Sequence, residues 1–314
     1  MAQTPNTITA MKPVFIDNTL CSGCGLCVEV CSYRALKTED GCARYLLDNC
    51  FSCGHCQAVC PEEAVSLPGL TQPVKTTLQA VGSESKVAES LAIAGLVDLM
   101  ARRRSCRNYK DKMVPLSLLE ELVQIGITAP SGTNCQPWNF VILPERDDLL
   151  VFGSHIGTYF KSLNRLAESR IIRLFTRMFT AGGLNRYYEN HYKSVKEAIH
   201  DWDDNGEDRL FHGARAAILV TAKTSASCPA EDALLATQNI LLAAHSMGLG
   251  ACLIGFAVEA VQRDKNIRHI LGLPDDEKLY AVIAIGYPKI SYVRPAVRKK
   301  VTPRIFRFDK DGQT

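Results

Sequence analysis

The sequence predicts a chain of two parts, a small cysteine-rich domain followed by a larger α+β domain. Nine of the 13 cysteines lie before residue 61. Polar residues dominate 70–90, and beyond them helical and strand-like patterns alternate without a regular βαβ rhythm. The length of 314 residues suits one large domain or two ordinary ones. We therefore expect domains over residues 1–75 and 91–314, joined by a linker over 76–90.

The composition excludes several classes of protein. Hydrophobic residues make up 46% and charged residues 22% of the chain, as in ordinary globular proteins. The net charge of +3 argues against a protein that binds nucleic acid through bulk charge. No stretch approaches the roughly 20 apolar residues that span a bilayer, and the first 13 residues contain no secretory signal. We expect a cytoplasmic protein that binds neither nucleic acid nor membrane.

The small domain repeats one cysteine spacing, C-x2-C-x2-C-x3-C. Three thiolates at two-residue gaps can face one iron–sulfur cube, and the glycines at 23, 25 and 54 supply tight turns. Structural zinc normally uses two CxxC pairs, and a disulfide scaffold needs an oxidising compartment. The spacing therefore predicts two [4Fe-4S] clusters. The ligands are Cys21, Cys24, Cys27 and Cys31 in the first run and Cys50, Cys53, Cys56 and Cys60 in the second.

These runs, CSGCGLCVEVCS and CFSCGHCQAVCP, resemble a bacterial-type two-cluster ferredoxin over about the first seventy residues. In that arrangement the fourth cysteine of each run ligates the other cluster, so Cys60 joins the first three cysteines and Cys31 joins the second set. Ser32 stands where the family usually has proline, a departure that concerns the local turn and not the ligand. We interpret Cys42 as a small buried residue. We interpret His55 as a neutral surface loop residue, the alternative being that it tunes the second cluster by hydrogen bonding.

The larger part begins with apolar residues at helical spacing from Val87. A helix is predicted over roughly 115–127, and residues 155–200 look mainly helical and rather basic. An apolar helix over 233–247 ends at Gly248. Strands are predicted over 138–143, 214–222, 251–255 and 279–286. This order indicates α+β layers around a central sheet.

Two polar motifs of the larger part are candidates for a binding site. Three or four arginines and a serine between Arg102 and Arg107 suit a phosphate dianion, although a solvated basic face at a helix end has the same composition. The loop over 129–138 could hydrogen-bond the edge of a flat heterocycle, or it is an ordinary connecting turn. No G-x-G-x-x-G follows a strand, so a Rossmann site is not predicted.

Four blocks, RRRSCRNY, APSGTNCQPWNFVIL, ATQNILLAAHSMGLGACLIGF and IAIGYP, resemble the FMN-dependent nitroreductase family in order and spacing. The resemblance covers roughly residues 95–300. It implies an α+β sandwich with FMN at the interface of a homodimer. In this sequence we find no candidate for a general acid or base, and we expect the flavin to carry the chemistry.

The resemblance assigns three groups of flavin-binding residues. The phosphate and ribityl chain contact the first block, and the isoalloxazine ring contacts the Pro-Ser loop of the partner subunit and the short strand after Gly250. A late basic residue returns to the phosphate, for which Arg298 fits best, with Arg294 and Lys299 as alternatives. The assigned residues are Arg103, Arg104, Ser105 and Arg107; Pro130, Ser131, Gly132 and Asn134; Leu253, Ile254 and Gly255; and Arg298.

The two parts together predict an iron–sulfur flavoprotein oxidoreductase. Electrons would pass from an external donor through both clusters to FMN, and on to a nitro compound, a quinone or another oxidised organic acceptor. The donor is reduced ferredoxin or NAD(P)H. One alternative is an NAD(P)H-fed reductase whose clusters carry electrons outward; another is a non-catalytic redox sensor or electron-transfer module. Residues 150–212 either cover the flavin or form a surface helical hairpin.

Overall fold

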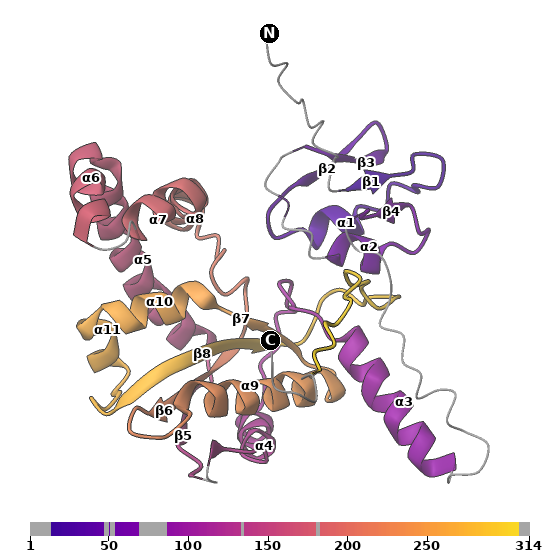
Figure 1. Cartoon of the computed structure of the whole chain (residues 1–314). Coiled ribbons are helices and arrows are strands. Elements are labelled where there is room, and N and C mark those ends of the chain that lie inside the picture. Colours follow the sequence, from indigo (N-terminus) through magenta and orange to yellow (C-terminus); the bar gives the residue numbers. More distant parts are fainter. Residues whose placement is uncertain are drawn as a thin grey trace. The chain divides into compact units, whose positions relative to one another are not determined.

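The computed structural model describes residues 14–46, 50, 54–68, 87–132, 135–179 and 183–307. The chain forms two compact units (Figure 1). One contains the residues up to Arg102 together with those from Tyr292 onward, and the other spans Arg103–Ser291. The domain limits at 75 and 90 stay a prediction. In the part of the chain that is described, no helix is both long and apolar enough to cross a membrane.

The first unit folds its two cysteine runs alike. Each run contains a short helix, α1 (Leu26–Glu29) or α2 (His55–Val59), which begins directly after a glycine. Gly25 and Gly54 have φ values of 75° and 74°, a left-handed conformation that glycine adopts without steric cost. The glycines therefore turn the chain into each helix as the sequence predicts.

Two small antiparallel ladders complete the iron–sulfur part of this unit. β1 (Phe15–Ile16) pairs with β4 (Val65–Ser66), and β2 (Leu36–Glu39) pairs with β3 (Cys42–Tyr45). Val30, Ala58 and Val59 are almost fully buried between these elements. The same unit contains α3 (Val87–Arg102) and the C-terminal segment from Tyr292. The helix predicted to start at Val87 is thus confirmed.

The second unit is built on an antiparallel sheet of β5 (Trp138–Leu143), β6 (Ala216–Lys223), β7 (Gly250–Leu253) and β8 (Glu277–Gly286). The strands lie in the order β5-β6-β8-β7. The central strand β6 is buried along nearly its whole length and pairs with β5 on one side and β8 on the other. β7 pairs with β8 on one side, and its other side forms the edge of the sheet, where Ser105 bridges to Ala251.

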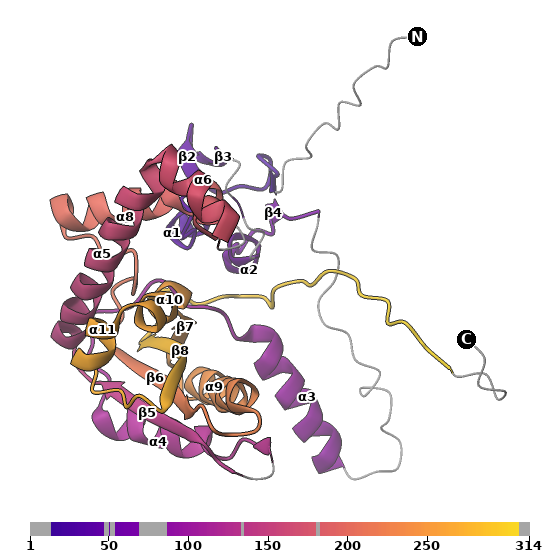
Figure 2. The same cartoon turned by 60° about the vertical axis from the view of Figure 1, so that its left-hand side comes forward.

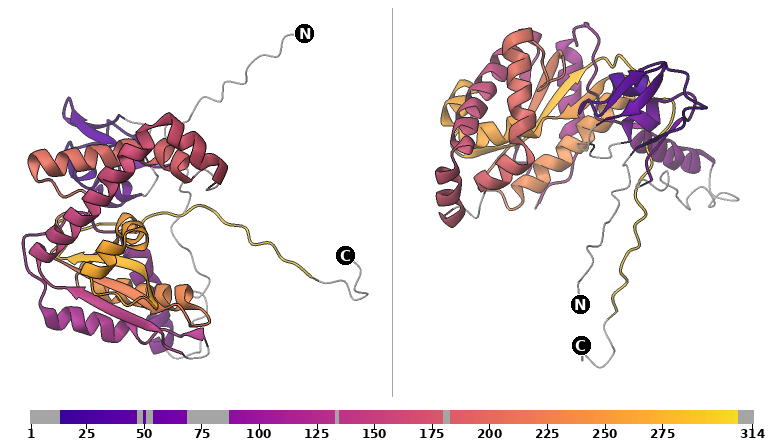
Figure 3. Two further views of the ribbon diagram at one scale, coloured as in Figure 1. Left: turned by 90° about the vertical axis from the view of Figure 1, so that its left-hand side faces the viewer. Right: turned by 90° about the horizontal axis from the view of Figure 1, so that it is seen from above.

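Helices cover both faces of this sheet (Figures 2 and 3). Ala217 and Leu219 of β6 lie in one apolar core with residues of α5 (Arg146–Glu168) and α10 (Gly255–Arg263). The alternate residues Ile218 and Val220 lie in a second core with α4 (Leu116–Gly126) and α9 (Pro229–Ser246). Because successive strand residues point to opposite faces, one strand serves both cores. The predicted α+β sandwich is confirmed.

The predicted elements agree with the structure in kind and differ at their ends. The stretch 155–200 is helical, and the apolar helix starts at Pro229, four residues before its predicted beginning at 233. The sequence did not predict α10 or α11 (Lys265–Ile270), which are short helices between β7 and β8. Further helices are α6 (Arg170–Phe179), α7 (Gly183–Asn190) and α8 (Tyr192–Asn205).

Candidate functional site

Four cysteines of the first unit lie close to one another. Burial and then the neighbouring Cys60, Cys21 and Cys24, in that order, raise the pKa of the Cys27 thiol to about 11. Cys27 sits in α1, whereas Cys60 ends α2, so the two helices bring the runs together. These four are the cysteines predicted to share one cluster. Such a set of thiols fits iron, because the metal ions compensate the like charges of the thiolates.

Three cysteines of the other predicted ligand set line a small pocket of the first unit that opens to solvent. Cys31, Cys50 and Cys56 contribute to its wall, and Cys53 lies outside the described residues. Much of the remaining lining is apolar and includes Leu36. Thiols in an apolar hollow suit an iron–sulfur cluster, whose potential depends on its exposure to solvent.

Backbone N–H groups point at two of these sulfurs. Ala35 donates to Cys31 Sγ at 3.3 Å, and Ala43 donates to Cys21 Sγ at 3.5 Å. The bond from Ala43 is the main cause that lowers the pKa of Cys21. The bond to Cys21 thus favours the thiolate form that ligates metal.

Two expectations about the cysteine runs need correction. His55 is only 5% exposed and is not a surface residue, because Gly54 turns it into the first position of α2. Cys42 is partly buried, and its Sγ lies 3.9 Å from the carbonyl oxygen of Cys21. In the described part of the chain, no three His, Cys, Asp or Glu side chains are arranged to hold a single metal ion. The cysteines of a four-iron cluster lie further apart, since each binds a different iron.

In the second unit, the arginine-rich segment runs along the free edge of the sheet. Ser105 forms a parallel bridge with Ala251 of β7, and the Cys106 N–H donates to the Ala251 carbonyl at 3.0 Å. A Cβ added at Gly250 would lie 2.6 Å from Cys106 Sγ, so this close approach requires glycine. The segment is therefore fixed against β7 by the backbone, and its arginine side chains need not hold it there.

The arginines of this segment gather around the end of β7. Burial raises the pKa of the Cys252 thiol, and Arg107, Ser105 and Arg103 oppose that shift, which places all three near Cys252. Arg104 is only 7% exposed and donates to the carbonyl oxygen of Arg103 at 2.9 Å. Guanidinium groups and a hydroxyl concentrated at one place form a donor set that fits a phosphate.

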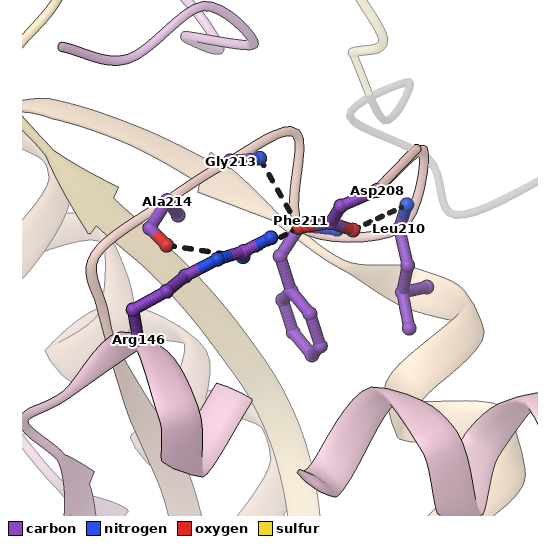
Figure 4. Close-up of polar contacts among 6 residues, drawn as sticks. All are labelled: Arg146, Asp208, Leu210, Phe211, Gly213 and Ala214. Atoms are coloured by element: carbon purple, nitrogen blue, oxygen red, sulfur yellow. Dashed lines mark hydrogen bonds and ion pairs between the residues drawn. The ribbon is translucent and has the colours of Figure 1, made fainter. Parts of the chain in front are cut away.

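A tightly bonded loop over 208–214 lies near Arg107, and its polar contacts are shown in Figure 4. Asp208 accepts hydrogen bonds from the N–H groups of Leu210, Phe211 and Gly213 at 2.7–3.1 Å. It also pairs with Arg146 at 2.6 Å. The loop carries His212, which lies near enough to Arg107 for that charge to lower its pKa. The sequence did not predict a role for Asp208 or His212, since neither residue belongs to a recognisable motif.

We predict that His212 stays neutral in mildly acidic solution. Burial and then Arg107 lower its pKa to about 4, whereas a free imidazole titrates near 6.5 and would be roughly nine-tenths protonated at pH 5.5. The unfolded chain takes up this proton and the native state does not, so the free energy of unfolding should fall as the pH drops from 6.5 toward 4. Histidine NMR on flavin-free protein between pH 7.5 and 5.5 measures the protonation of His212. The His212→Gln variant assigns its signal. Protonation near pH 6.5 would contradict the prediction.

The Pro-Ser loop is anchored to α9. The Gly132 N–H donates to Asp232 Oδ1 at 2.8 Å, and Cys135 Sγ donates to the other carboxylate oxygen at 3.6 Å. Asp232 is buried in the first turn of α9, where the helix dipole favours a negative charge. Ser131 Oγ accepts from the N–H of Gln136 at 3.0 Å. Asp232 was not among the predicted residues, although its place after Pro229 is typical of a first helical turn.

The remaining predicted flavin contacts lie at the junction of β7 and α10 and in the C-terminal segment of the first unit. Leu253 ends β7 and is exposed, and Ile254 is buried at the start of α10, followed by Gly255 with open space beside its Cα. Asn134 lies outside the described residues. Arg298 belongs to the C-terminal segment of the first unit and donates to the carbonyl oxygens of Ala296 and Val297. Its contact with the flavin phosphate therefore stays a prediction.

Comparison with protein families decides what this chain is. The model of the nitroreductase family matches residues 100–287, more than half of the chain. This chain belongs to the nitroreductase family. The model of the 4Fe-4S dicluster domain matches residues 20–64, which contain both cysteine runs. The chain is thus a nitroreductase-family oxidoreductase with an N-terminal dicluster domain, and both predicted resemblances are confirmed.

Individual relatives support this assignment over the second unit. A protein of Archaeoglobus fulgidus with the provisional name NADH dehydrogenase/NAD(P)H nitroreductase is 27% identical over 192 residues, 60% of this chain and 82% of the relative. The 4-nitrobenzoate reductase of a Nocardioides species is 25% identical over 210 residues, 62% and 81% of the two chains. A crystal structure of a Bacteroides fragilis nitroreductase with bound FMN shares the fold, with a TM-score of 0.51 and 22% identity. That match covers 68% of this chain and 98% of that one.

Proposed function

We propose that this nitroreductase-family protein binds FMN as well as two [4Fe-4S] clusters and passes electrons from an external donor through the clusters to the flavin. The acceptor is an oxidised organic compound such as a nitro compound or a quinone. The observation that carries the proposal is that one chain holds both a thiol-rich dicluster domain and a guanidinium-rich segment fixed along β7. The name of the Nocardioides relative supports a nitro compound as acceptor.

The residues of this chain would divide the binding of FMN among them. Arg103, Arg104 and Arg107, with the Ser105 hydroxyl, would hold the phosphate. Residues 253–255 would contact one face of the isoalloxazine ring. In a homodimer, residues 130–134 of the second copy would contact the other face of that ring. FMN, when bound, supplies the chemistry, since it accepts electrons singly and delivers two as a hydride.

The first test is the cofactor content of the protein purified without oxygen. We expect about eight iron atoms, about eight acid-labile sulfides and one FMN per chain, because two four-iron clusters and one flavin site are proposed. Elemental analysis, sulfide determination and the visible spectrum of released flavin measure these values. Zinc as the main metal, or absence of flavin after gentle purification, would contradict the proposal.

A second candidate donor is NAD(P)H, which the name of the Archaeoglobus relative favours. In that case nicotinamide reduces the flavin directly and the clusters carry electrons outward. An anaerobic screen of acceptors with reduced ferredoxin, NADH and NADPH as alternative donors separates the two directions. If no small acceptor is turned over with any donor, a redox sensor or electron-transfer module becomes the better interpretation.

A further inference from the structure

The C-terminal segment of the chain packs onto the second cysteine run. The Tyr292 ring lies 5.6 Å from that of His55, between ring centroids. The Arg294 N–H donates to the Ala58 carbonyl at 3.3 Å, and its guanidinium donates to the carbonyl oxygen of Cys60, which is 234 residues away in the chain. All these partners lie between His55 and Cys60, so the segment is part of the iron–sulfur unit.

Arg294 donates hydrogen bonds to carbonyl groups at the C-terminal end of the short helix α2. The last carbonyl groups of a helix have no partner within it, and arginine side chains near a helix end commonly bond them. The backbone leaves the helical conformation at Cys60, where φ is −70° and ψ is 115°. Pro61 follows and has no N–H to donate. The bond to the Cys60 carbonyl therefore helps to set the direction in which this cysteine leaves the helix.

The guanidinium of Arg294 also bridges to the turn beyond Cys60. It pairs with Glu63 at 2.8 Å, and the side chains of Arg294 and Glu63 are 28% and 75% exposed. Glu63 has a φ of 55°, a left-handed conformation that residues other than glycine seldom adopt. One side chain thus fixes both the carbonyl of Cys60 and the strained residue that ends the turn.

The charge of Arg294 has a consequence for a cluster ligated by Cys60. Arginine stays protonated at every physiological pH. Reduction adds one negative charge to a cluster, and a fixed positive charge near a ligand stabilises the reduced form. Cys60 lies with Cys21, Cys24 and Cys27, as the influence of these cysteines on the Cys27 thiol shows. The effect should therefore fall mainly on one of the two clusters.

We propose that Arg294 is a positioning residue for the cluster ligand Cys60 and that its charge raises the reduction potential of the cluster that Cys60 ligates. This inference rests on the proposed binding of two clusters. It gives Arg294 a role different from that of an alternative contact to the flavin phosphate.

The experiment compares Arg294→Gln, Arg294→Lys, Glu63→Gln and Arg304→Gln in the full-length holoprotein. Arg304 is a matched control, since it is an exposed arginine of the same segment. Anaerobic redox titration followed by electron paramagnetic resonance gives the midpoint of each cluster, and iron and FMN are measured on the same samples. Wild-type iron is determined first, so that failure of the proposed function is recognised separately.

We expect Arg294→Gln to lower one midpoint by the equivalent of a three- to tenfold change in the reduction equilibrium, about 30–60 mV for one electron. The other midpoint should move less, and FMN content should not change. Glu63→Gln should raise the same midpoint, because it leaves the guanidinium charge uncompensated. Arg294→Lys and Arg304→Gln should stay near the wild-type values. Loss of iron in Arg294→Gln with retention in Arg294→Lys also supports the proposal.

Other results overturn it. Unchanged midpoints and iron in Arg294→Gln would show that the contact has no influence on the cluster. A shift of equal size in Arg294→Lys would exclude the charge as the cause. Loss of FMN with unchanged midpoints would return Arg294 to the flavin phosphate. A wild-type protein without iron would overturn the two-cluster proposal and this inference with it.

Discussion

Replacing Cys27 with alanine should remove one cluster and stop reduction of the flavin by reduced ferredoxin, while FMN stays bound. Cys27 is buried beside Cys60, Cys21 and Cys24, and alanine cannot ligate iron. The arginines and the serine of 103–107 proposed to hold the phosphate lie in the other compact unit, which begins at Arg103. Iron should fall to about four atoms per chain. Anaerobic bleaching of the visible flavin band after addition of reduced ferredoxin should drop to the background rate.

The matched control for this experiment is Cys42→Ala, which changes a cysteine outside both runs and should keep both clusters. A point variant is sharper than removal of the N-terminal domain, because residues 292–294 pack on that domain and would lose their partners. Rapid bleaching of Cys27→Ala by ferredoxin would defeat the proposed electron path. Equally fast bleaching of both proteins by NADH would indicate that the clusters are the outlet.

Replacing Arg103 with alanine should weaken FMN binding about ten- to a hundredfold and leave the clusters intact. Loss of one charged hydrogen-bond donor to a phosphate costs roughly 1.5–3 kcal/mol. Arg103 is partly exposed, so its replacement is less disruptive than that of the buried Arg104. Titration of flavin-stripped protein with FMN, followed by flavin fluorescence, gives the dissociation constant, and iron analysis checks the clusters.

The adjacent Arg102 provides the control for this prediction. It ends α3, is exposed, and pairs with Asp98 of the same helix at 2.8 Å. Arg102→Ala should therefore leave the affinity for FMN within about twofold of wild type, since exposed ion pairs contribute little. Equal losses in both variants, or no loss in Arg103→Ala, would mean that the arginines only end a helix in solvent.

The elements that local sequence controls were predictable. The cysteine runs place ligands and glycines within a dozen residues of each other, so spacing alone predicts two clusters. β6 is a continuous apolar run because both of its faces are covered, and α4 shows the periodicity of a helix with one buried side. The arginine-rich segment could be proposed for phosphate from composition, with the helix-end alternative left open.

Only the tertiary structure showed which distant residues meet. Asp232 anchors the Pro-Ser loop across 100 residues, and Asp208 pairs with Arg146 across 62. His55 is buried although its neighbours suggested a surface loop, and Arg294, an alternative to Arg298 for the flavin phosphate, bonds the backbone of Cys60. Hydrogen bonds and burial of this kind depend on where the whole chain brings its segments, and neither periodicity nor motif spacing encodes them locally. The sequence therefore determined the cofactor chemistry and the elements, and packing decided which side chains position the ligands.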